Sequence, residues 1–169
     1  RGIALLPEHE AVVKRVIHTT ADFDYAEALR FTENAVERAV EALRAGASIV
    51  TDTNMARSGV SKAALSKLGG EVRCYMADPD VAAAAKARGT TRAVVCMDKA
   101  AKEHPVGVLA VGNAPTALLK ICELMEAGLR PALVIGAPVG FVNVVESKER
   151  VFDACERFGV PCIAAMGRK

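Results

Sequence analysis

The sequence is poor in aromatic residues and has almost no excess charge of either sign. Among its 169 residues there is no Trp, with two Tyr and five Phe, and the formal net charge is +2. Proteins that bind nucleic acid need a basic face to neutralise phosphates, and those that bind single strands also use aromatic rings on which bases stack. We therefore expect no nucleic-acid partner.

Signatures of disulfides, metal sites, nucleotide loops and membrane spans are also missing. The five cysteines are odd in number and form no Cys-x-x-Cys pair, and His9, His18 and His104 show no metal-binding spacing. No Gly-x-Gly-x-x-Gly follows the first predicted strand, and no P-loop sequence occurs. No apolar run approaches the roughly 18–20 residues of a spanning helix, and no signal peptide is recognisable. We expect a cytoplasmic protein without a membrane partner.

The chain contains instead an alternation of helical and strand-like segments. Apolar spacing predicts helices over 8–17 and over 31–45, the second ending at Gly46. Five short β-rich runs follow, separated by amphipathic stretches: 47–52, 71–76, 107–112, 131–136 and 161–166. Strands joined by helices of this length pair in parallel. We predict an α/β, doubly wound, mainly parallel five-stranded sheet with helices on both faces (flavodoxin-like), in a single domain over 1–169.

Four loops that follow predicted strands have unusual compositions. They cover 51–59, 112–117, 136–143 and 167–169 and are dense in Gly, Asn, Ser, Thr or cations. Each also has an ordinary structural interpretation: Asn113 caps a helix, the glycines of 136–143 form a tight turn, and the cations are solvated. Because ligands of open parallel sheets bind beyond the carboxyl ends of the strands, their coincidence favours a binding edge. Amides, hydroxyls and cations suit a ligand with several carboxylates.

The segment VIHTTADFD (16–24) lies where the first predicted helix ends. One interpretation makes His18 a C-terminal helix residue, where the macrodipole favours a cation by roughly 0.3–1 kcal/mol. The other makes it a general acid, since imidazole has an unperturbed pKa of about 6.5. Asp22 and Asp24 either orient the imidazole or cap the helix that follows. The nine residues alone leave both interpretations open.

Five segments in order carry a family resemblance: RVIHTTADFDYA, TDTNMARSGV, VGNAPTALLK, GAPVGFVNVVESK and the closing GRK. Together they span almost the whole chain, which resembles the precorrin-8X methylmutase (cobalt-precorrin-8 methylmutase) family of corrin biosynthesis. Family chains carry a segment before the position of Arg1 and continue after the Arg-Lys through glycines into a last helix. We therefore expect this chain to lack the family's N-terminal segment and C-terminal helix.

The resemblance implies an isomerase that moves a methyl group between adjacent carbons of the macrocycle, giving hydrogenobyrinate or its cobalt-containing counterpart cobyrinate. It implies a tetrapyrrole-derived polycarboxylate substrate, no cofactor, and a homodimer with a pocket at the subunit interface, and the histidine spacing already argues against a metal held by the protein. The sequence leaves open whether the substrate carries cobalt. Two other hypotheses are a tetrapyrrole-binding module without turnover, and a flavodoxin-like phosphate or nucleotide binder supported by fold analogy alone.

The family's motifs also imply the residues of the site. The histidine of the HTT motif makes His18 the catalytic acid. Arg57, Lys148 and Arg168 are expected to hold the substrate's carboxylates. The expected substrate-binding residues are Thr19, Thr20, Asp22, Thr53, Asn54, Met55, Arg57, Ser58, Asn113, Ala114, Pro115, Thr116, Ala137, Pro138, Gly140, Phe141, Lys148 and Arg168.

Overall fold

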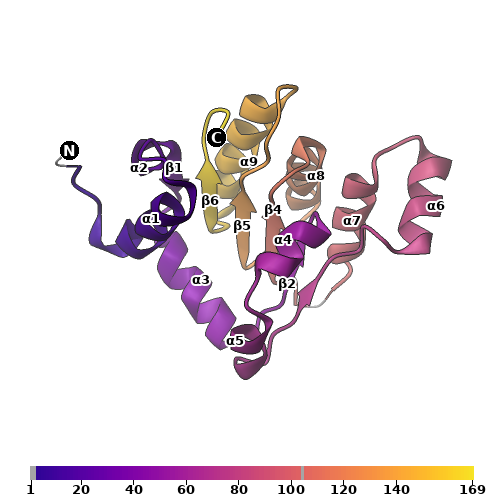
Figure 1. Ribbon diagram of the computed structural model, residues 1–169. Coiled ribbons are helices and arrows are strands. Elements are labelled where there is room, and N and C mark those ends of the chain that lie inside the picture. Colours follow the sequence, from indigo (N-terminus) through magenta and orange to yellow (C-terminus); the bar gives the residue numbers. More distant parts are fainter. Residues whose placement is uncertain (1–2, 104) are drawn as a thin grey trace.

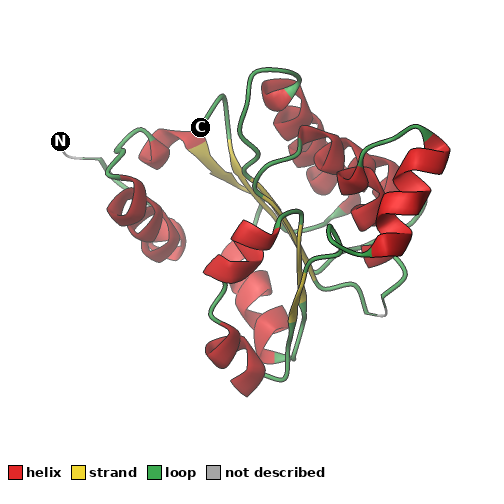
Figure 2. Cartoon of the chain, turned by 45° about the vertical axis from the view of Figure 1, so that its right-hand side comes forward, coloured by secondary structure: helices red, strands yellow, loops and turns green. Residues whose placement is uncertain are grey.

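The computed structural model describes residues 3–103 and 105–169, which form one six-stranded sheet with helices on both of its faces (Figures 1 and 2). Its spatial order is β1-β6-β5-β4-β2-β3. All neighbours pair in parallel except β1, which runs antiparallel to β6. The strands are β1 (Leu29–Phe31), β2 (Ile49–Thr51), β3 (Val72–Arg73), β4 (Val108–Val111), β5 (Leu133–Gly136) and β6 (Cys162–Ala165).

The predicted α/β class and the mainly parallel pairing are confirmed, but the predicted number of five strands is wrong. The additional strand is β1, whose residues Leu29, Arg30 and Phe31 pair with Ala165, Ala164 and Ile163. Phe31 was predicted to begin a helix, which in fact begins at Ala35. Three residues are too few to show a period of two, so only the pairing with β6 defines this strand.

The five parallel strands follow, in chain order, the spatial order 2-1-3-4-5. In this arrangement the strand order reverses between the first and third parallel strands, here β2 and β4, and ligands of such folds bind at that point. The second predicted run, 71–76, shortens to the two residues of β3. The outermost strand on this side of the sheet is therefore very short.

Side chains alternate between two packing layers along the central strands. Leu109 and Val134 belong to the large core formed with α7, α8 and α9, whereas Val108 and Leu133 pack with Ala39 of α3 on the other face. The helices are α1 (Pro7–Thr20), α2 (Tyr25–Ala28), α3 (Ala35–Arg44), α4 (Asn54–Gly59), α5 (Lys62–Lys67), α6 (Pro79–Arg88), α7 (Arg92–Ala100), α8 (Pro115–Glu126) and α9 (Val144–Phe158).

Local sequence accounts for several helix boundaries. The Thr91 hydroxyl accepts the Val94 N–H at the start of α7, and Pro115 stands in the first turn of α8, where its missing N–H costs nothing. The helices α6 and α9 end at glycines in the left-handed conformation, Gly89 and Gly159. Among the helices described, none combines the length and apolar character needed to cross a membrane.

Candidate active site

The antiparallel strand β1 carries the segment around His18 to the carboxyl edge of the sheet. Leu29, the first residue of β1, pairs with Ala165, the last residue of β6. The Met166 N–H continues the ladder by donating to the Ala28 carbonyl over 2.8 Å. The residues before β1 therefore lie beyond the carboxyl end of β6, so α2 and the C-terminus are neighbours (Figure 1). The predicted loops after β2, β4 and β5 begin at the same edge.

His18 lies within the last turn of α1 and its side chain is exposed. The helix was predicted to stop at residue 17, but it continues to Thr20 and ends at Ala21, whose φ of 55° is left-handed. The Thr19 and Thr20 hydroxyls donate to the carbonyls of Arg15 and Val16, over 2.9 and 2.8 Å. Both threonines therefore extend the helix, and neither hydroxyl proton is free for a ligand in this arrangement.

A mainly apolar hollow of about 520 Å³ lies beside the His18 imidazole, within the size range of small-molecule sites. Its polar lining groups are His18 and Lys14, and Lys14 pairs with Glu10 one turn earlier in α1. The imidazole thus faces a largely apolar surface that suits a flat hydrophobic ring. The hollow is lined by Ile3, Leu5, Lys14, Ile17, His18, Ala21, Phe23 and Ala26.

The carboxylates of Asp22 and Asp24 both bind Lys169. The Lys169 Nζ lies 2.6 Å from Asp22 Oδ2 and 2.9 Å from Asp24 Oδ2, and Asp22 Oδ1 accepts the Asp24 N–H over 2.9 Å. The Lys169 ammonium lowers the pKa of Asp22 from its usual 3.8. In the described part of the chain neither carboxylate bonds to His18, and Asp24 makes no side-chain cap on α2. These aspartates hold the turn after α1.

The predicted loop after β2 is largely the short helix α4. The Thr53 hydroxyl caps it by accepting the Ala56 N–H over 3.1 Å, and the Ser58 hydroxyl donates to the Asn54 carbonyl over 2.9 Å. Asn54 and Arg57 are exposed, and Met55 is 86% exposed. This helix therefore presents an amide, a thioether and a guanidinium to solvent.

Asp52 organises the loop after β4, a role that sequence reasoning missed. Its side chain is completely buried and accepts the N–H groups of Gly112, Asn113 and Ala114 over 2.9, 2.8 and 2.8 Å. It spans the point between β2 and β4 where the strand order reverses. The sequence feature that could have revealed this role is an acidic residue directly after a buried strand.

The interpretation of Asn113 as the cap of α8 is wrong. The N-cap is Ala114, with no side-chain cap of its own, and Asp52 takes the amides instead. The Asn113 side chain is exposed. Pro115 begins the helix, and the Thr116 hydroxyl lies 3.2 Å from that of Thr91, the N-cap of α7. Asn113 is thus available to a ligand at the carboxyl edge.

The loop after β5 combines a tight backbone with exposed apolar side chains. The Ala137 N–H donates to the Val111 carbonyl over 2.8 Å, and Pro138 is buried. Gly140 has a φ of 130°, a conformation that side chains rarely adopt, whereas Gly136, the other glycine of this segment, is the last residue of β5. Phe141, one residue later, is 86% exposed. The turn thereby presents an aromatic ring at the carboxyl edge.

The predicted cations differ in their surroundings. Arg57 and Arg168 are exposed, whereas Lys148 is 0% exposed and donates to the carbonyls of Gly167 and Lys169 over 3.1 and 2.7 Å. Burial lowers the pKa of Lys148. Its interpretation as a solvated surface charge is wrong, and its contact with substrate stays a prediction.

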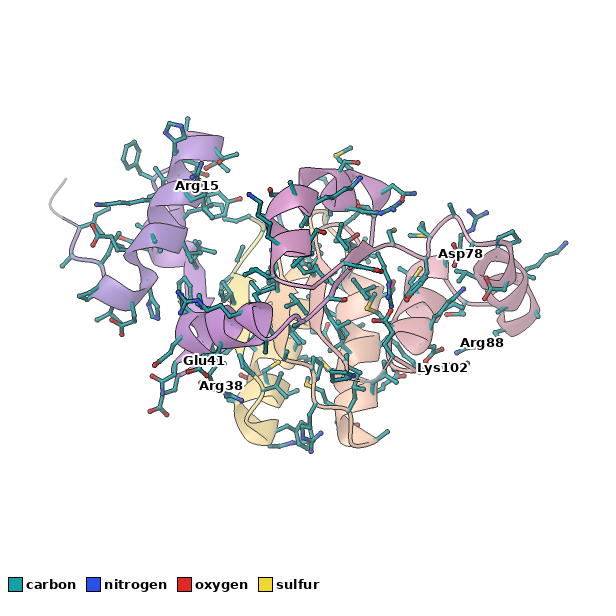
Figure 3. The ribbon with its side chains drawn as sticks, turned by 90° about the horizontal axis from the view of Figure 1, so that it is seen from below. Arg15, Arg38, Glu41, Asp78, Arg88 and Lys102 are labelled. Carbon is teal, nitrogen blue, oxygen red and sulfur yellow. The ribbon has the colours of Figure 1, made fainter. Side chains whose placement is uncertain are left out.

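The remaining histidines and the labelled cations of Figure 3 have other surroundings. Figure 3 shows Arg15 and Arg88 on opposite sides of the molecule, so the labelled cations do not gather on one face. His9 lies in the first turn of α1, where its ring stacks on Phe31 at 3.9 Å. His104 lies outside the described residues. Among those described, no group of three His, Cys, Asp or Glu is placed to hold a metal ion.

A sequence model of the precorrin-8X methylmutase family matches residues 3–169. The chain belongs to this family. It is 48% identical to the cobalt-precorrin-8 methylmutase of Salmonella typhimurium over 164 residues, which cover 96% of this chain and 75% of that protein. It is 40% identical to the precorrin-8X methylmutase of Pseudomonas aeruginosa over 162 residues, covering 95% and 76%.

A solved structure gives the same result. The precorrin-8x methyl mutase from Thermus thermophilus superposes with a TM-score of 0.86 at 42% identity, covering 98% of this chain and 79% of that one. The isomerase class and the place in cobalamin biosynthesis expected from the sequence are thereby confirmed. The methylmutase motifs lie around the carboxyl edge of the sheet and the end of α1.

Proposed function

We propose that this methylmutase moves a methyl group between adjacent ring carbons, converting precorrin-8X or cobalt-precorrin-8 to hydrogenobyrinate or cobyrinate, with His18 as the general acid. The observation that supports it most is the antiparallel pairing of β1 with β6. This pairing brings an exposed imidazole to the edge where Arg57 and Asn113 are also exposed. This supports a site in which the imidazole acts on a macrocycle held by the hydrogen-bonding groups and cation of the loops.

The chemistry requires a proton but no net consumption of one. A proton donated by the His18 imidazolium to the conjugated ring makes the ring electron-deficient. The methyl group then moves with its bonding electron pair to the neighbouring carbon, and release of the proton restores the charge. A positioned general acid contributes about a hundred- to ten-thousand-fold in rate.

The substrate's two chemical characters have counterparts at this edge. The apolar hollow beside His18 and the exposed Met55 and Phe141 suit the faces of a macrocycle. The exposed Arg57 and Arg168 suit its peripheral carboxylates, since guanidinium forks bind carboxylates in pairs of hydrogen bonds. The remaining predicted binding residues belong to the same proposal, except Asp22 and Lys148, whose charged groups are bound to Lys169 and to the backbone of 167–169. Turnover of metal-free and cobalt-containing substrate, measured side by side, identifies the preferred one.

The phosphate-binding hypothesis is disfavoured by Asp52. In a flavodoxin-like fold an anion would bind at the reversal of the strand order and at the start of α8. The buried Asp52 carboxylate already accepts three amides there, from Gly112, Asn113 and Ala114. A phosphate at that place would meet a negative charge instead of free donors.

We also propose that the protein is a homodimer, as its family resemblance implies. The exposed apolar side chains of Phe23, Phe141 and Val142 support it, because large exposed apolar groups mark interaction sites. Light scattering tests this proposal: a fully active monomer at working concentration would contradict it. The cytoplasmic location and the single domain expected from the sequence stay predictions.

The proposed reaction is tested by replacing His18 with Ala and following the macrocycle's absorption without added reductant or nucleotide. We expect the wild-type protein to convert the spectrum and the variant to be slowed by about a hundred- to ten-thousand-fold. Because His18 is exposed, the variant should remain folded and bind product. The matched control is His9→Ala on the same helix, whose ring stacks on Phe31.

Three results would contradict the proposal in different ways. Near-normal turnover by His18→Ala excludes this histidine as the acid. A spectrum that shifts without conversion by the wild-type protein indicates a binding module without turnover. An unfolded His18→Ala protein, with His9→Ala folded and active, indicates a structural role for His18.

A further inference from the structure

Lys169 joins the C-terminal turn (residues 167–169) to the turn that follows His18, and Lys148 holds the C-terminal turn to α9. Lys169 bridges Asp22 and Asp24, which lie 147 and 145 residues earlier in the chain. The side chains of Lys169 and Asp22 are 30% and 35% exposed, whereas that of Asp24 is 68% exposed. The shorter and better protected contact is with Asp22, which makes it the main partner of Lys169.

Lys148 holds the same C-terminal turn from the other side. Its buried ammonium donates to the carbonyls of Gly167 and Lys169, so the backbone that carries the Lys169 side chain is fixed to the first turns of α9. In the described part of the chain Lys148 forms no ion pair with a carboxylate. A buried ammonium is costly unless it is hydrogen-bonded, and these two carbonyls supply such bonds.

The His18 end of α1 has few other attachments. Val13 is the buried residue of α1, and the helix contacts mainly α2 and α3. Between Thr20 and β1 the backbone is held by turns, including the left-handed Ala21. An exposed ion pair contributes little to overall stability. The contact of Lys169 with Asp22 therefore matters chiefly for where the last turn of α1 lies.

We propose that Lys169 is a positioning residue for methyl transfer, which fixes the helix end carrying His18 through Asp22 while Lys148 fixes Lys169. The inference rests on the proposed role of His18 as the acid. A general acid must lie within about 2.6–3.2 Å of the atom that it protonates. A displacement of about 1 Å costs about a hundredfold in rate. Loss of Lys169 should therefore slow the chemical step and spare ring binding.

The test compares Lys169→Met, Lys169→Arg and Asp22→Asn with Lys67→Met, a control at an exposed lysine of α5. We expect Lys169→Met and Asp22→Asn each to lower kcat by about 10- to 100-fold with KM within about twofold. Lys169→Arg should recover most of kcat, since a cation is retained. The double variant Lys169→Met/Asp22→Asn should be no slower than the slower single variant, because Lys169→Met already removes the contact that Asp22→Asn breaks.

Amide hydrogen exchange gives a readout that does not depend on the role of His18. Exchange over residues 19–25 should be faster in Lys169→Met than in Lys67→Met, with unchanged melting temperatures. Unchanged exchange and unchanged kcat in Lys169→Met, with an inactive His18→Ala, would overturn the inference and leave the proposed function standing. A raised KM with normal kcat would overturn it too, since Lys169 would then bind substrate. An active His18→Ala protein removes the proposed function instead.

Discussion

Replacing Asp52 with Ala should destabilise the protein more than any exposed carboxylate replacement. The buried Asp52 carboxylate accepts three amides, at 2.8–2.9 Å, at the start of α8. Hydrogen bonds to a charged group contribute about 1.5–3 kcal/mol each, and an anion at a helix N-terminus about 0.3–1 kcal/mol. The three bonds share one carboxylate, and Gly112 and Asn113 are exposed, so water can replace part of the loss. We expect a total of about 3 kcal/mol.

Thermal unfolding followed by circular dichroism measures this effect. For a chain of this size 1 kcal/mol corresponds to about 2–4 °C, so the melting temperature should fall by about 6–12 °C. Asp52→Asn should lose most of the same stability, because its carboxamide keeps one acceptor oxygen and turns an N–H₂ group toward an amide donor. The control Asp153→Ala, at an exposed position of α9, should change stability by less than about 0.5 kcal/mol.

Asp52→Ala and Asp52→Asn proteins that melt like Asp153→Ala would refute the reasoning. Such a result would mean that the loop over 112–114 keeps its shape without the carboxylate. If the reasoning holds, a second effect follows at the proposed site. Asn113 loses its fixed backbone, and KM for the macrocycle should rise in Asp52→Asn even below the melting temperature.

Four further outcomes can be measured. Neutralising Arg57 and Arg168 together should weaken substrate binding and reduce its salt dependence; unchanged affinity would make both mere surface charges. Phe141→Ser should weaken ring binding or dimerisation while the melting temperature stays within about 2 °C, because the ring is exposed. Cys74 is partly exposed, whereas the other four cysteines are buried. Cys74 should therefore react first with a thiol reagent, as measured by mass spectrometry of the labelled peptides. The pKa of Asp22 is lowered by Lys169, so the ionised carboxylate contributes fully to stability above pH 3.8, and this contribution is lost as acid protonates the carboxylate. Asp22→Asn should therefore flatten the acid side of the curve of stability against pH.

The parallel core of the fold was predictable because its strands are buried on both faces. Runs such as 108–111 are almost wholly apolar and are separated by helices with their own stripes, so class and pairing direction follow from pattern alone. The strand β1 carries no such signal. Its three residues include the exposed Arg30, and they become a strand only through Ala164 and its neighbours in β6.

The loops of the candidate site were predictable in place, but their internal contacts were not. The rule that ligands bind beyond the carboxyl ends of parallel strands located the loops, yet it says nothing of which side chains the protein uses for itself. Lys148 shows why. It follows the buried Val144 by four residues and precedes the buried Phe152 by four, so it lies on the apolar stripe of α9. That spacing indicates that Lys148 is buried, whereas its residue type alone predicts an exposed side chain.

The strand β1 and the contacts of Lys169, which the sequence did not predict, both determine where His18 lies relative to the sheet. A parallel α/β sheet gathers at its carboxyl edge only the loops that directly follow its strands, and the segment with His18 precedes all five parallel strands. An antiparallel strand at the border reverses this geometry, because the residues before β1 lie where β6 ends. The position of His18 then depends on tertiary contacts of β1 and Lys169, whereas each loop after a parallel strand is placed by the strand itself. Substitutions that weaken the β1–β6 pairing, such as Phe31→Pro, should therefore reduce methyl transfer more than they reduce binding of the macrocycle.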